Sequence, residues 1–95
     1  MEQSVSNIDD QYREMLNFRD TLIEFDLSLD RAMRDLQARH DSVSPLWQDE
    51  MRRHYDAQWK PLHDTLRHYV AVEGPSYVEF LSIKLYALER YLHGG

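Results

Sequence analysis

A seven-residue repeat of apolar side chains runs through the first half of this 95-residue chain. Its first set of positions holds Ile8, Met15, Leu22, Leu29, Leu36 and Val43, and its second set holds Phe18, Phe25, Ala32 and Leu46. Two apolar positions in every seven place a stripe along one side of an α-helix. The repeat therefore predicts a continuous helix from about Ser6 to His40, roughly 50 Å long at 1.5 Å per residue.

A turn and a second helix are expected next. Asp41 to Pro45 supplies capping side chains and a proline, whose fixed φ and missing N–H suit the first turn of a helix. The second helix is predicted from Pro45 to about Val72. Its apolar stripe consists of Met51, Tyr55, Trp59, Leu62 and Leu66. Pro61 lies inside this helix and predicts a kink or a break after Lys60.

A third helix is predicted from about Ser76 to Leu92, because Gly74 fits the position after a helix end and Pro75 fits a helix start. One of its stripes consists of Val78, Leu81, Leu85, Leu88 and Leu92, and an adjacent one of Tyr77, Phe80, Ala87 and Tyr91. A helix this apolar must be covered on two sides, and a second subunit is the simplest cover.

The expected fold is all-α. It consists of a long antiparallel helical hairpin at about residues 6–73 and a shorter third helix at about residues 76–93. We expect a single domain over residues 1–95 that dimerises into a helical bundle, because a chain of 95 residues buries only a modest core alone.

Charge and composition exclude several classes of function. Seventeen acidic residues against eleven Lys and Arg give a net charge of −6, which repels phosphate backbones, so nucleic acid is not an expected partner. The absence of cysteine excludes disulfides and thiolate metal sites. No apolar run reaches membrane-spanning length and no cleavable signal is visible, which predicts a cytoplasmic protein, or one secreted without a signal peptide, and no membrane insertion.

No catalytic, cofactor or metal site is predicted. Glu50 and His54 lie four residues apart, as do Asp64 and His68, but each pair offers only two ligands and is better explained as a surface ion pair. The serines next to Asp41 are natural helix caps, and their neighbourhood in sequence is not triad geometry. We therefore expect a non-enzymatic protein that acts through protein–protein interaction.

The turn carries a further pattern. Trp47-Gln48-Asp49 follows a long helix, and Tyr55 and Trp59 follow on the next one. Over about residues 5–73 the chain resembles the WXG-type helical-hairpin proteins of type VII secretion, with Asp49 where that family has glycine. The resemblance implies an antiparallel helix pair that forms a homodimer or a heterodimer with another hairpin. It also implies export as a folded dimer, or service as the partner of a larger secreted protein.

The resemblance implies residue roles as well. The family often carries a Tyr-x-x-x-Asp/Glu export signal beyond the second helix, and Tyr69 and Glu73 fit its form. Partner binding is expected at the turn and on the third helix. The residues concerned are Trp47, Asp49, Tyr55, Val78, Leu81, Leu85 and Leu88. Trp59 is expected in the core.

An alternative stays open at this point. The chain could be a cytoplasmic three-helix adaptor or an immunity-type protein, whose acidic surface and apolar third helix hold a toxin or a regulatory partner. A metal-binding enzyme would be a third class, but no residue pattern demands it. Both leading hypotheses describe a binding protein.

Overall fold

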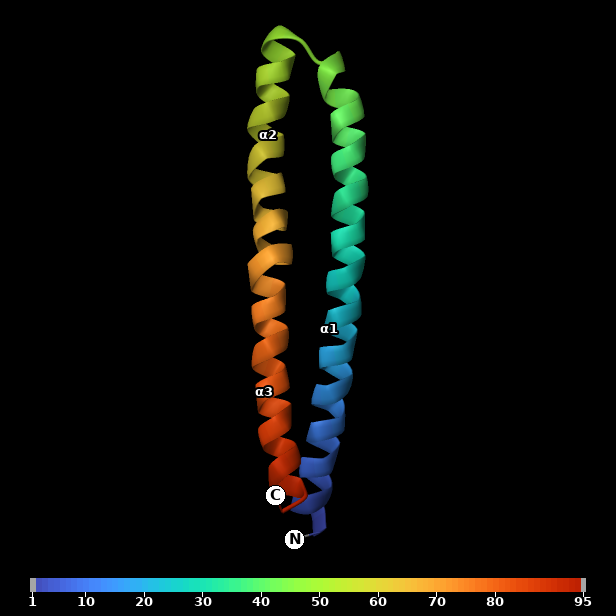
Figure 1. Cartoon of the computed structure of the whole chain (residues 1–95), viewed down its shortest axis with the longest axis vertical. Helices are drawn as coiled ribbons and strands as arrows, with labels where there is room; N and C mark the ends of the chain where they lie inside the picture. Colours follow the sequence, from blue (N-terminus) through green and yellow to red (C-terminus); the bar gives the residue numbers. More distant parts are fainter. Residues whose placement is uncertain (1, 95) are drawn as a thin grey trace. The chain divides into compact units, whose positions relative to one another are not determined.

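The computed structural model describes residues 2–94 of the chain, with side chains for residues 7–94. The described part is helical and contains no strand, so the predicted all-α class is confirmed (Figure 1). Its elements in chain order are α1 (Glu2–Val43), the 3₁₀-helix η1 (Ser44–Leu46), α2 (Asp49–His68), the π-helix η2 (Tyr69–Glu73) and α3 (Gly74–Leu92). Two long helical stretches therefore account for the fold, one on each side of η1.

The turn between these stretches lies later than predicted. α1 continues to Val43, because neither glycine nor proline interrupts the chain before Pro45. Pro45 does not begin the second helix. It lies in η1, and the backbone at Trp47 and Gln48 is extended before α2 begins at Asp49. Pro45 has no backbone N–H to donate to the carbonyl of Asp41, so the α-helical hydrogen-bond pattern is interrupted where η1 begins.

Asp49 has a φ of 55°, and it is the one described non-glycine residue with a positive φ. A Cβ atom costs energy in this left-handed region, which glycine adopts freely and which Asp tolerates better than most residues. This is the position at which the WXG-type family has glycine. The backbone here thus has the geometry that a glycine would favour.

This geometry predicts an inverted order of stability for two variants. Asp49→Gly and Asp49→Ala both remove the carboxylate, and they differ only by a Cβ atom. We expect Asp49→Gly to be the more stable by about 1 kcal/mol, although alanine is normally favoured over glycine in a helix by a similar amount. Chemical denaturation of both variants measures the difference, and a more stable Asp49→Ala would contradict the left-handed assignment.

Pro61 does not break the second helix. α2 runs from Asp49 to His68 with this proline inside it. Proline removes one backbone N–H donor from a helix interior. The sequence prediction of a kink or a break is therefore corrected on the point of a break, because the helix continues on both sides of Pro61.

The predicted separate third helix is corrected as well. Gly74 has φ −59° and ψ −55°, which is ordinary helical backbone, and its N–H donates to the carbonyl of Tyr69 in the i→i+5 pattern of a π turn. The backbone therefore passes from η2 into α3 without a break before Pro75. A Cβ at Gly74 would lie 3.0 Å from Oδ2 of Asp26, so the glycine serves a close approach to α1 instead of a helix end.

The chain divides into two compact units. Unit 1 consists of the described parts of Met1–Phe25 and Pro75–Gly95, and unit 2 is Asp26–Gly74. In unit 2 the later part of α1 and α2 form an antiparallel hairpin, since His40 contacts Tyr55 while Asp26 contacts Tyr69. The prediction of a single domain over residues 1–95 stays a prediction.

The two units differ in what fills them. Leu81 and Leu85 in unit 1 are 6% and 3% exposed, and they are the only buried apolar side chains among the described residues. In unit 2 half-buried aromatic and polar side chains lie together with the half-buried aliphatic side chains of Leu29, Met33, Leu66 and Val70. The described residues thus give unit 1 a small buried aliphatic core and unit 2 a mixed interior that contains stacked rings.

Candidate protein-binding surface

The predicted first apolar set of α1 is half-buried at Ile8, Met15, Leu22 and Leu29, whereas the predicted second set is not. A different row of half-buried side chains takes the place of that second set. They recur every seven residues, one position beyond the predicted second set. We call this set the contact row, and it consists of Tyr12, Arg19, Asp26, Met33 and His40, all half-buried. Since it contains two charged residues and a histidine, hydropathy does not reveal it.

Two contacts of the contact row are polar. In unit 1 the guanidinium of Arg19 donates to Oγ of Ser82 over 3.4 Å. In unit 2 the hydroxyl of Tyr69 donates to Oδ1 of Asp26 over 2.8 Å. Half-buried polar groups that are hydrogen-bonded specify register without adding apolar area. Hydrogen bonds thus contribute to holding α1 in its register.

An aromatic ladder fills the hairpin of unit 2. In order along the ladder, the rings are Trp47, Tyr55, His40, Trp59 and His63. Successive ring centroids lie 5.6, 5.5, 4.1 and 5.4 Å apart, with interplanar angles between 7° and 26°. Nδ1 of His40 also forms a 2.7 Å hydrogen bond with the Tyr55 hydroxyl. His40 of α1 is therefore held between two rings of α2.

The turn is closed by hydrogen bonds to Ser44. The carbonyl of this buried residue accepts from the backbone N–H of Trp47 over 3.2 Å and from the guanidinium of Arg52 over 2.9 Å. Arg52 in turn pairs with Asp56 at 3.0 Å. The indole N–H of Trp47 is buried and has no hydrogen-bond partner among the described residues. Trp47, predicted as a partner-binding residue, thus packs on the ladder with an unmatched donor.

The predicted second apolar set of α1 is largely exposed. Phe18 is 51% exposed and Phe25 is 54% exposed. We call the exposed apolar residues of α1 on this side the exposed seam, and they are Phe18, Phe25, Ala32, Leu36 and Val43. The predicted burial of Leu36 and Val43 is corrected, because the contact row occupies the interface in their place.

In unit 1 the exposed seam continues into an aromatic cluster. Phe18 meets the ring of Tyr77 edge-on at 6.4 Å, and Tyr77 stacks on Phe80 at 6.3 Å. Both residues of α3 are exposed. A groove of about 650 Å³ lies beside them, and it is lined by Asn7, Asp10, Gln11, Glu14, Met15, Phe18, Tyr77 and Leu81. It offers an apolar floor with an acidic rim.

In unit 2 the exposed seam borders a smaller groove of about 160 Å³. This groove is lined by Leu36, Arg39, His40, Val43, Tyr55 and Trp59. On α2 the predicted apolar stripe is only partly covered, because Tyr55, Trp59 and Leu66 are half-buried while Met51 and Leu62 are exposed. Each unit therefore presents apolar side chains that its own helices leave uncovered.

The predicted partner-binding stripe of α3 lies inside unit 1. Leu81 and Leu85 are buried, and Val78 and Leu88 are half-buried. These side chains pack within the chain, and the exposed apolar residues of α3 belong to the neighbouring stripe that contains Tyr77 and Phe80. The helical period thus located the stripe correctly, but its side chains are not presented at the surface for a partner.

The residues of the predicted export signal lie at the two ends of η2. Tyr69 is half-buried and bonded to Asp26, whereas Glu73 is exposed and lies 3.6 Å from His68. The hydrogen bond to Asp26 raises the pKa of Tyr69 above its ordinary value of 10.0, with smaller contributions from burial and from the charges of Asp26 and Glu73. The fold therefore favours the protonated phenol.

This raised pKa predicts a loss of stability at alkaline pH. The unfolded chain gives up the Tyr69 proton first, so the stabilisation is fully present below about pH 10 and is lost as pH rises through the higher folded pKa. We expect the free energy of unfolding to fall from about pH 9 upwards, and to fall less in Tyr69→Phe. Denaturation at several pH values checks this, and equal slopes would contradict it.

The histidine and carboxylate pairs are not arranged as predicted. Glu50 pairs with Arg53 at 2.9 Å instead of with His54. His68 pairs with Glu73 instead of with Asp64. The described residues contain no group of three side chains placed to hold a metal ion.

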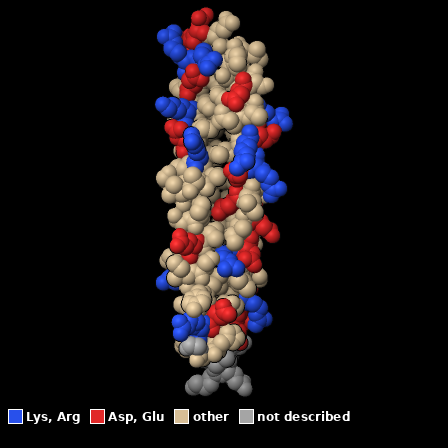
Figure 2. Space-filling view, in the orientation of Figure 1, with Lys and Arg blue, Asp and Glu red and all other residues tan. Residues whose placement is uncertain are grey.

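Charges of both signs alternate over the surface. Figure 2 shows Lys and Arg beside Asp and Glu on the face in view, with uncharged surface between them. Most Arg–carboxylate pairs of the described residues join residues three or four positions apart on one helix.

No helix in the described part is both long enough and apolar enough to cross a membrane. No protein-family model, curated protein or solved structure matched this chain.

Proposed function

We propose that this chain is a non-enzymatic helical-hairpin protein that works by binding another helical hairpin along the exposed seam of α1. The observation that carries the proposal is the register of α1. Its contact row uses polar and aromatic side chains inside the chain, which leaves a row of large apolar side chains in contact with water. Such a surface is typical of a protein-interaction site. A second copy of the chain is the simplest partner, because each copy would present the same row of exposed apolar side chains for burial against the other.

Two features of the turn support kinship with small type VII secretion substrates or partners. The left-handed backbone at Asp49 suits the glycine of the family pattern, and Trp47 lies two residues before it. Under this proposal Tyr69 and Glu73 are the candidate export signal, and recognition of Tyr69 would require release of its bond to Asp26.

The alternative is an adaptor or immunity-type protein that holds a toxin or a regulatory partner. Burial of Leu81 and Leu85 favours it, because unit 1 closes an aliphatic core without a second subunit. Under this alternative the exposed seam binds a different protein, and self-association is not required.

The test is the solution mass of the chain over a dilution series, together with two variants. We expect a dimer for the natural chain, dissociation for Leu36→Asp, and an unchanged dimer for Leu27→Asp. Leu27 is a matched control, because it lies on α1, is 56% exposed and is not part of the exposed seam. A monomer at all concentrations would favour the adaptor, and equal effects of both variants would exclude the exposed seam as the interface.

A further inference from the structure

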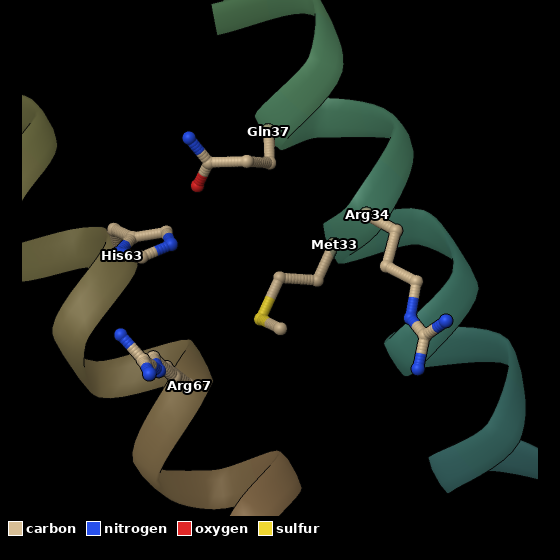
Figure 3. Close-up of a pocket in the computed structure, with 5 residues that line it drawn as sticks. All are labelled: Met33, Arg34, Gln37, His63 and Arg67. Carbon is tan, nitrogen blue, oxygen red and sulfur yellow. The ribbon is translucent and has the colours of Figure 1, made fainter. Parts of the chain in front are cut away.

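A second surface of unit 2 has a chemistry different from that of the exposed seam. An open cleft of about 470 Å³ lies between α1 and α2 (Figure 3). It is lined by Met33, Arg34 and Gln37 of α1 and by His63 and Arg67 of α2. None of these residues lines the two grooves beside the exposed seam.

The inner part of this cleft is lined mainly by apolar atoms, and one of its side chains is held in place by ring stacking. In Figure 3 the side chains of Met33 and Gln37 extend from α1 toward α2, and His63 extends from α2 toward α1. All three are half-buried. The ring of His63 stacks on Trp59 at 5.4 Å, which links the cleft to the aromatic ladder. An incoming side chain would therefore meet a thioether and an imidazole held in place.

Both helices add an arginine to this cleft, in a chain whose net charge is −6. Arg34 is exposed and pairs with Asp30 of its own helix at 3.1 Å. Arg67 has no ion pair or hydrogen bond in the described structure. Asp64 precedes Arg67 by three residues, but it lies 4.0 Å from Nδ1 of His63. The guanidinium of Arg67 thus keeps its full set of donors for a ligand.

We propose that this cleft binds a glutamate or aspartate side chain presented by an acidic segment of a partner protein. Arg67 donates to the carboxylate, in the paired geometry that a guanidinium offers to a carboxylate. Met33 and the ring of His63 contact the aliphatic stem. The apolar lining favours a carboxylate on a hydrocarbon stem over a hydrated phosphate, which has no such stem. The open shape suits a protruding side chain better than an enclosed small molecule.

Titration with a hexaglutamate peptide whose ends are blocked tests this inference. The readout is the ¹H–¹⁵N NMR signals of His63 and Arg67, including the side-chain Nε–H of Arg67. We expect saturable shifts in the natural chain and about tenfold weaker binding in Arg67→Gln, because one charge-assisted pair is lost. In Arg31→Gln we expect affinity within about twofold of the natural chain, since only long-range charge changes there.

Arg31 is the matched control, because it is exposed on α1 and bonds only to the carbonyl of Leu27 in its own helix. Equal weakening in both variants would overturn the proposal, since it would show attraction by net charge alone. Shifts that do not saturate would overturn it as well. So would inorganic phosphate if it moved the same signals as strongly as the peptide. These variants do not touch the exposed seam, so the outcome is independent of the proposed hairpin partner.

Discussion

Replacing Leu85 with alanine should lower the free energy of unfolding by about 2 to 4 kcal/mol, the usual cost of a large-to-small change in a core. Leu85 is 3% exposed, and Leu81 is the only other buried apolar side chain among the described residues. In a core this small, few neighbouring side chains can move into the cavity that the substitution leaves. The loss is therefore large relative to the roughly 5 to 10 kcal/mol that stabilises a domain of this length.

Urea denaturation followed by circular dichroism measures this loss, at one fixed protein concentration because self-association would shift the midpoint. Ile83→Ala is the control on the same helix, since Ile83 is 60% exposed. It should cost less than about 1 kcal/mol. Similar losses for the two variants would show that Leu85 is not part of a distinct core.

The period of the apolar residues predicted α3 well and α1 only in part. In α3 the stripe through Leu81 and Leu85 points into unit 1, as a period of 3.6 residues indicates. In α1 two neighbouring sets compete for the inside, and hydropathy favours the set that contains Phe18 and Phe25. The structure instead turns the row that contains Asp26 inward, and Asp26 and His40 of this row form hydrogen bonds across the hairpin.

Those partners explain why the register could not be read from the sequence. The bond from Tyr69 to Asp26 joins residues 43 positions apart, and no local pattern announces it. Gly74 shows the same limit. Next to Pro75 it resembles a helix end, yet it lies within a continuous helix and leaves room for the carboxylate of Asp26. Gly74 does have a structural role, but the residue that requires a glycine there is distant in the sequence.

The sequence likewise indicated only some of the residues of the candidate binding surfaces. The pattern of the turn predicted a role for Trp47 and Asp49 in partner binding, and this stays a prediction; the structure adds a positive φ at Asp49. The cleft at Arg67 was missed, because its residues come from two helices and share no spacing. The sequence also places Asp64 three residues before Arg67, which suggests an ion pair that the structure does not form.

Replacing Trp59 with alanine should destabilise unit 2 by about 2 to 3 kcal/mol, slightly less than for a fully buried tryptophan because Trp59 is half-buried. Its indole stacks on His40 at 4.1 Å and on His63 at 5.4 Å. The variant removes two of the four ring contacts in the ladder. His40 would then be packed from one side only, by Tyr55.

Two further variants distinguish the contribution of ring stacking from that of side-chain volume. Trp59→Phe keeps an aromatic ring and should lose only about 1 kcal/mol. Met51→Ala removes an exposed side chain from the same helix and should lose less than about 0.5 kcal/mol. Urea denaturation orders the three variants, and near-ultraviolet circular dichroism reports on the ladder itself. If Trp59→Ala were as mild as Met51→Ala, the ladder would not be what holds α1 against α2, and the hydrogen bond between Asp26 and Tyr69 would have to carry that role. The expected order instead assigns much of the stability of unit 2 to its stacked rings.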